Sequence, residues 1–199
     1  MRNTSRLFRA ALMLSFMLVV AVTATSAQTT PPPAPALQRM TIQATAMGTS
    51  TQMGKMFNVN LHIEQFSTPD ERKALIDAFA RSGQDGLVDA LEKMKSKGRI
   101  STPWGVGNEI KYVFELPSEN GRHLRLITDR RISIAEARNA PRSEQYSIAA
   151  VDLVLASDGK GTGTLLPACK LTVNKKKQQI EVESFQNPWK LTNLIIRKL

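Results

Sequence analysis

Short segments in which apolar and polar residues alternate recur along most of this chain, and tight turns separate them. In MFNVNLHIEQF, for example, Phe57, Val59 and Leu61 fall on one side of an extended chain and polar residues fall on the other. Such alternation is typical of a strand with one buried face. Similar segments begin near residues 41, 109, 123, 164 and 180. Strands at this spacing predict an antiparallel, meander-like β-sheet.

Two segments of the predicted sheet are less regular. YSIAAVDLVLA, residues 146–156, is apolar on both sides, which indicates a central strand. The chain end FQNPWKLTNLII, residues 185–196, fits either the last strand of the sheet or a tail that binds a partner. Trp189 favours the strand, because large aromatic residues commonly anchor a chain end by burial.

The only clear helical signals lie between two of the predicted strands. Thr68, Pro69 and Glu71 supply a capping hydroxyl, a proline at the first helical position and an acid three residues after the cap. A second helix start is predicted at Ser82, and Gly98 is expected to end that helix. The two apolar faces consist of Leu75, Ile76, Phe79, Leu87, Leu91 and Met94. The predicted fold is therefore α+β, an antiparallel sheet covered by an α-helical hairpin.

The first 27 residues have the composition of a Sec-type signal peptide. Basic residues precede the apolar run AALMLSFMLVVAVTA, which is shorter than the roughly 20 residues of a membrane-spanning helix. Cleavage is predicted after Ala27, and an uncleaved anchor is the alternative. Residues 28–39 predict a proline-rich linker, and residues 40–199 predict a single α+β domain. The mature protein is therefore expected in the periplasm or outside the cell, with no transmembrane segment.

The charge of the chain favours acidic partners without identifying one. Its formal net charge is +10, and once three basic residues leave with the signal, 24 basic and 17 acidic residues give +7. Predicted export argues against a role on genomic nucleic acid. The single cysteine, Cys169, excludes an internal disulfide, and because it alternates with Leu171 in ACKLTV we expect it to be buried.

The arginine-rich segment DRRISIAEARNAPRSEQY, residues 129–146, raises the question of an anion-binding site. Its four arginines are interleaved with three acids, which leaves a net charge of only one. An anion site concentrates uncompensated donors, so the favoured interpretation is a solvent-exposed connection. If an acidic ligand binds here, Arg138, Asn139 and Arg142 are the candidate binding residues.

The sequence offers little for catalysis or metal binding. His62 and His123 are the only histidines, and neither lies in HExxH or HxH spacing. GxSxG is absent, and SDGKGTG lacks the residue order of a Walker phosphate loop. We therefore assign no catalytic residue, no metal ligand and no cofactor, and we expect both histidines at the surface.

The segments ARNAPRSEQYS, GKGTGTLLPAC and QNPWKLTN resemble uncharacterised bacterial exported proteins. The resemblance is consistent with export. Because no activity is attached to that family, it implies no ligand, cofactor or catalytic residue for this chain.

Together these features predict an exported, non-catalytic module that binds a small ligand or another protein of the cell envelope. One alternative is a hydrolase-like enzyme that uses His62 or His123, and another is a structural or assembly component of the envelope. A ligand-binding module needs a concave, partly apolar pocket. An enzyme of this kind needs a histidine with an acid or hydroxyl partner.

Overall fold

The structure is a computed structural model, which describes residues 39–103, 105–118, 121–132, 134, 146–156 and 160–198. These residues belong to the compact unit Ala34–Leu199, and the other unit, Met1–Pro33, lies outside them. The predicted signal peptide also lies outside the described residues, as does all of the predicted linker except Arg39.

Within the described ranges the chain forms nine strands, one α-helix and one short 3-10 helix. In chain order the elements are β1 (Met40–Gly48), η1 (Ser50–Gln52), β2 (Met56–Ile63), α1 (Pro69–Lys93), β3 (Gly98–Ser101), β4 (Asn108–Leu116), β5 (Arg122–Thr128), β6 (Ile148–Leu155), β7 (Gly161–Asn174), β8 (Gln179–Gln186) and β9 (Trp189–Lys198).

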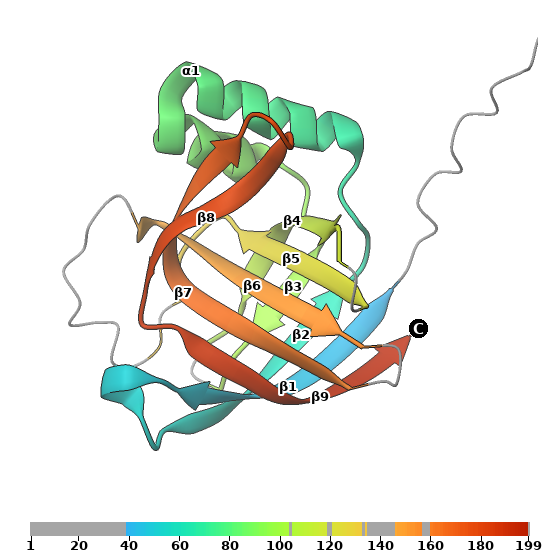
Figure 1. Ribbon diagram of the computed structural model, residues 1–199, viewed down its shortest axis with the longest axis vertical. Coiled ribbons are helices and arrows are strands. Elements are labelled where there is room, and N and C mark those ends of the chain that lie inside the picture. Colours follow the sequence, from blue (N-terminus) through green and yellow to red (C-terminus); the bar gives the residue numbers. More distant parts are fainter. Residues whose placement is uncertain are drawn as a thin grey trace, which may run out of the picture. The chain divides into compact units, whose positions relative to one another are not determined.

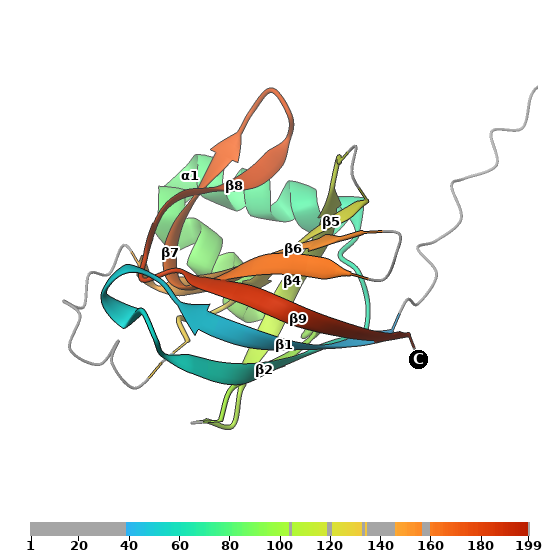
Figure 2. The same ribbon diagram turned by 60° about the horizontal axis from the view of Figure 1, so that its bottom comes forward.

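Eight of these strands close into an antiparallel barrel (Figures 1 and 2). The order around the barrel is β6, β5, β4, β3, β2, β1, β9 and β7, and β7 pairs again with β6. The predicted α+β fold, a meander-like sheet covered by a helical hairpin, is therefore wrong. Closure depends on β1 pairing with β9 and β7 pairing with β9, and these pairs join opposite ends of the chain or skip a strand. A closed barrel leaves no exposed sheet edge among its strands.

The barrel interior is filled by the apolar residues that alternate along each strand. Ile42, Ala44 and Ala46 of β1 face inward as predicted, and the inward residues of β2 meet them. Phe57 and Trp189 pack edge to face at one end, with ring centroids 4.7 Å apart. The buried residues of this cluster are each at most 8% exposed. Eight strands enclose a space that side chains can fill, which is the case here.

Strand β7 is longer than the others and leaves the barrel part-way along. Its first part pairs with β6 and β9, and its second part, from Ala168 to Asn174, pairs with β8. The β7–β8 hairpin consequently projects from the barrel beside α1 (Figure 2). β8 is the ninth strand of the sheet and lies outside the closed ring.

The helical region, α1, consists of two helical segments that meet at a kink, and they pack on the wall of a closed barrel instead of covering an open sheet as predicted. The capping box at Thr68 and Glu71 is confirmed, because each residue hydrogen-bonds to the backbone N–H of the other. The helix is kinked at Ser82 and Gly83, where a second start was predicted, and it ends at Lys93. Gly98 does not end the helix. It begins β3, where an added Cβ would clash with the carbonyl oxygen of His62.

The outer wall of the barrel carries a second apolar cluster, which packs α1 onto it. Leu75, Leu87 and Leu91 of the helix are fully buried against Tyr112 and neighbouring residues of β4 to β8. This second layer explains why β6 is apolar on both sides. One side faces the barrel interior and the other faces the outer cluster.

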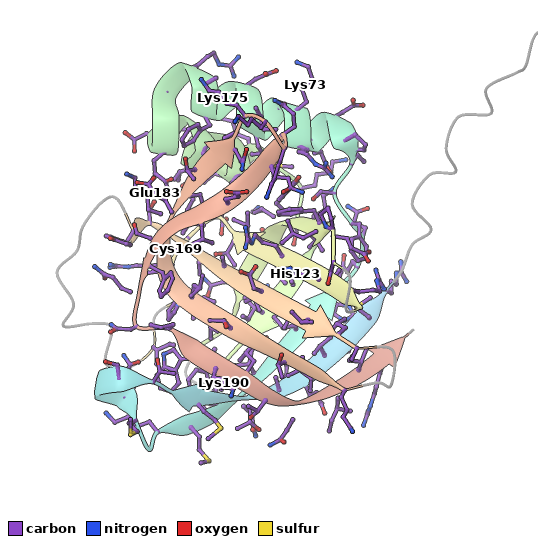
Figure 3. All side chains as sticks on the ribbon, viewed as in Figure 1. Lys73, His123, Cys169, Lys175, Glu183 and Lys190 are labelled. Atoms are coloured by element: carbon purple, nitrogen blue, oxygen red, sulfur yellow. The ribbon has the colours of Figure 1, made fainter. Side chains whose placement is uncertain are left out.

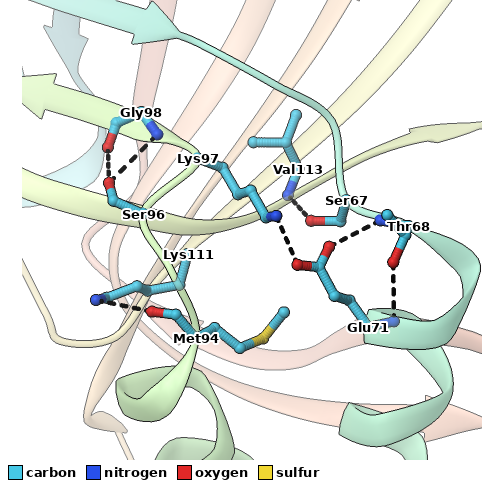
Figure 4. A network of polar contacts seen from close by, with 9 residues as sticks. All are labelled: Ser67, Thr68, Glu71, Met94, Ser96, Lys97, Gly98, Lys111 and Val113. Atoms are coloured by element: carbon cyan, nitrogen blue, oxygen red, sulfur yellow. Dashed lines mark hydrogen bonds and ion pairs between the residues drawn. The ribbon is translucent and has the colours of Figure 1, made fainter. Parts of the chain in front are cut away.

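Buried polar groups fix both ends of α1 (Figure 4). At its start, the Lys97 ammonium pairs with Glu71, and the Ser67 hydroxyl accepts a hydrogen bond from the Val113 N–H at 3.0 Å. At its end, the Lys111 ammonium donates to the Met94 carbonyl oxygen at 3.2 Å. Because a buried polar group is costly when it lacks a partner, these bonds define where the helix sits on the barrel.

Two other predictions, a strand at the chain end and a buried cysteine, are confirmed. The chain end is a strand, β9, and Cys169 is buried. None of the helices formed by the described residues is long and apolar enough to cross a membrane.

Candidate functional site

Two open grooves lie beside β8, one lined by residues from the start of that strand and the other by Phe185 near its end. We call the first the hairpin groove. It has a volume of about 660 Å³ and is lined by Leu116, Pro117, His123, Arg125, Lys177, Gln179, Glu181 and Val182. The second, the β9 groove, has a volume of about 580 Å³. Both volumes fall within the range of small-molecule sites.

The hairpin groove is built by β5 and the overhanging β7–β8 hairpin. On β5, Leu124 and Leu126 point into the barrel, so the alternate residues His123 and Arg125 point outward. The tight turn between β7 and β8 brings Lys177 over this part of the wall. The groove thus combines residues that are more than 50 positions apart in the chain.

An ion pair between Arg125 and Asp152 separates the two grooves. These residues lie directly opposite each other on β5 and β6. The guanidinium holds both carboxylate oxygens, with Nε–Oδ1 and Nη2–Oδ2 distances of 2.6 and 2.8 Å. It also donates to the carbonyl oxygen of Ile180 at 3.2 Å, which ties β8 to the barrel. The Arg125 side chain is only 11% exposed, so this fork holds the floor of the groove in place.

The rim of the hairpin groove carries two basic side chains without a fixed partner. Within the part of the chain that the structure describes, neither the His123 ring nor the Lys177 ammonium makes a hydrogen bond or ion pair. Figure 3 shows His123 on the barrel wall and Lys175 in the β7–β8 turn. Glu181, the acid of the groove, accepts a hydrogen bond from the Asn174 side chain at 3.0 Å. Leu116, Pro117 and Val182 supply apolar surface beside these groups.

The β9 groove has a different character, because two of its apolar side chains are exposed. Phe185 is 51% exposed and Val154 is 36% exposed. Lys190 of β9 and Asp152 line the same groove. Thr49 and Pro188 line it as well, and the Thr49 hydroxyl donates a hydrogen bond to the Pro188 carbonyl oxygen at 2.6 Å.

The binding residues suggested by the sequence, Arg138, Asn139 and Arg142, lie outside the residues that the structure describes. The hairpin groove was missed because Arg125 and Asp152 each interrupt an apolar strand as a single charge. The opposite signs on neighbouring strands were a usable signal, but only once the β5–β6 register was known.

The two histidines lie on separate strands of the barrel. His62 is on the outer face of β2, where its side chain is 43% exposed, as predicted. Its Nδ1 lies 3.1 Å from the Thr41 hydroxyl, and its Nε2 lies 4.0 Å from Glu64. His123 is half-buried in the hairpin groove on β5, so its prediction as a plain surface residue was incomplete.

The groups left to consider for catalysis or metal binding are the Cys169 thiol and clusters of His, Cys, Asp and Glu side chains. Burial raises the pKa of the Cys169 thiol to about 12, so the thiol stays protonated and is a poor nucleophile. Across the described ranges, no three His, Cys, Asp or Glu side chains are grouped so that they could hold a metal ion.

Comparison of the chain with protein-family models, with curated proteins and with solved structures finds no match.

Proposed function

We infer that this is an exported, non-catalytic binding protein, and that it binds an anionic ligand with an apolar body in the hairpin groove. The observation that carries this proposal is the pairing, in one groove, of unpartnered basic groups with apolar surface. His123 and Lys177 are suited to hold a carboxylate, sulfonate or phosphate. Leu116, Pro117 and Val182 are suited to cover an adjacent aliphatic or aromatic part of the ligand.

The packed barrel interior supports an external site. An eight-stranded barrel either fills its interior with side chains or keeps room for one small ligand. Here the inward-facing residues of all eight strands pack against one another. A ligand of ordinary size is therefore better accommodated on the outer wall than inside the barrel.

The rival function, a hydrolase-like enzyme, has less support from the described residues. A general base needs an orienting partner and a nucleophile within hydrogen-bond reach. His123 has no such partner among the described residues, and the buried thiol of Cys169 is protonated. His62 contacts Thr41 on the open outer face of β2, where neither groove reaches.

The proposal can be tested with 8-anilinonaphthalene-1-sulfonate, a fluorescent probe with an anionic group and an apolar ring system. We expect saturable binding to the native protein at physiological salt, and competition by octanoate. The double variant H123Q/K177Q should bind the probe about tenfold more weakly, because the imidazole and the ammonium group that face the anion are both lost.

The matched control is H62Q/K73Q, which removes the same residue types from β2 and α1. Lys73 is paired with Asp77 and lines neither groove, so this variant should bind the probe like the wild type. Equal weakening in both variants would reduce the effect to net charge and contradict the proposal. Weakening by F185A alone would assign the probe to the β9 groove instead.

A further inference from the structure

Three exposed methionines lie on the β1–β2 hairpin, outside both grooves. Met47, Met53 and Met56 are 42%, 79% and 64% exposed, whereas Met40 on the same strand as Met47 is only 1% exposed. Sulfur atoms project from this end of the hairpin in Figure 3. Exposed methionines gain nothing from packing, so their concentration within ten residues calls for another explanation.

The strand register brings two of these side chains together. Met47 and Met56 lie directly opposite each other, and both point away from the barrel interior. The next pair, Gly48 and Lys55, is hydrogen-bonded, with the Gly48 N–H donating to the Lys55 carbonyl oxygen at 2.8 Å. Met47 and Met56 therefore occupy a non-hydrogen-bonded pair, the position at which cross-strand side chains are closest.

The third methionine comes from the turn that joins the two strands. Met53 follows the short helix η1, and Gly54 then takes a left-handed conformation with φ of 87° that returns the chain to β2. The turn thus keeps Met53 at the same end of the hairpin as the facing pair. A methionine side chain has three rotatable bonds, so its sulfur can swing toward the other two.

We propose that Met47, Met53 and Met56 form a binding site for a soft monovalent metal ion, Cu(I) or Ag(I). Thioether sulfur is a neutral, polarisable ligand that selects soft ions over Mg²⁺, Ca²⁺ or Zn²⁺. The site needs no deprotonation, because a thioether carries no proton to lose. Met47 and Met56 are the primary ligands, and Met53 completes the coordination.

The neighbouring charges are compatible with a monovalent ion. Lys190 is exposed and lies opposite Met47 on β9, and Lys55 is exposed in the turn. Their repulsion of a bound cation is weak in water and is screened by salt. It acts twice as strongly on a divalent ion, which adds to the preference that the sulfur ligands set.

The test uses the full chain with ¹³C-labelled methionine methyl groups, so that each methionine reports separately. The substitution C169A is included because a cysteine sulfur competes for soft ions. In chloride-free buffer, about one equivalent of Ag(I) should shift the methyl signals of Met47, Met56 and Met53, while those of Met40 and Met94 stay in place.

Leucine variants separate metal binding from a purely apolar role, since leucine keeps the apolar surface and removes the sulfur. M47L or M56L should weaken Ag(I) binding about tenfold or more, M53L should weaken it less, and M94L should leave it unchanged. Unchanged Ag(I) affinity in M47L/M56L, or signals that move equally for every methionine, would overturn the proposal. So would the absence of any shift at an equivalent of Ag(I), which would leave the hairpin as an apolar contact surface.

Discussion

Breaking the Arg125–Asp152 ion pair should destabilise the protein far more than breaking an exposed pair of the same geometry. The Asp152 side chain is 24% exposed and that of Arg125 is 11% exposed, so either partner left alone keeps a largely buried charge. Removing one partner of a fully buried pair costs about 3 to 5 kcal/mol. Because water reaches part of Asp152, we expect D152A to lower the free energy of unfolding by about 2 to 4 kcal/mol.

The barrel supplies a matched control. Arg122 and Glu115 also form a two-bond fork across neighbouring strands, at 3.1 and 2.9 Å, but their side chains are 32% and 45% exposed. Double-mutant cycles by urea unfolding, with R125M and D152A in one and R122M and E115A in the other, isolate the two pair energies. The bond from Arg125 to Ile180 is lost in both R125M proteins, so it cancels in the cycle.

We expect a coupling energy of about 2 kcal/mol for Arg125–Asp152 and below about 1 kcal/mol for Arg122–Glu115. Coupling energies equal within about 0.5 kcal/mol would refute the reasoning, because the two forks differ mainly in burial. D152A should also loosen β8, which would appear as faster hydrogen exchange of the β8 amides that pair with β7.

Three further predictions address the packing, the thiol and the arginine-rich segment. L91A should lower the free energy of unfolding in urea by about 2 to 5 kcal/mol, because Leu91 is fully buried between α1 and the barrel wall. A decrease below about 0.5 kcal/mol would mean that α1 does not pack there. Cys169 should react with a thiol reagent at pH 8 only after unfolding, because it is buried. Its pKa is raised from 9.0 to about 12 in the folded protein. As the pH rises between these two values, the free energy of unfolding should therefore fall more steeply for the wild type than for C169A. R138A/R142A should change the free energy of unfolding by less than about 1 kcal/mol. This variant should also reduce retention on an anionic matrix no more than K175A/K176A does. A loss of saturable binding in R138A/R142A alone would instead make the arginine-rich segment a binding site.

The sequence alone determined the faces of the strands and the start of the helix. Alternation in residues 56–63 identified the buried side of β2, and the capping box at Thr68 identified the first turn of α1. It also identified the burial of Cys169 and the use of the chain end as a strand. These features depend on residues within a few positions of one another, so a local pattern contains the information.

The sequence pattern does not predict β3, because a local pattern needs enough residues to be recognised. This strand has only four residues, GRIS, which are too few to display an alternation of apolar and polar residues. The position of Gly98 in the sequence predicts a helix end, because glycine often ends helices. In the structure its lack of a side chain instead allows a close approach to the backbone of His62.

Only the tertiary structure decided that the sheet is closed and where a groove lies on it. Closure requires β1 to meet β9 and β6 to meet β7, and the hairpin groove requires the β7–β8 hairpin to overhang β5. An alternating pattern specifies which side of a strand is buried but not whether another sheet, a helix or the far wall of a barrel buries it. The same limit applies to Arg125 and Asp152, whose charges are single interruptions in the sequence and become a buried pair through the register of two strands.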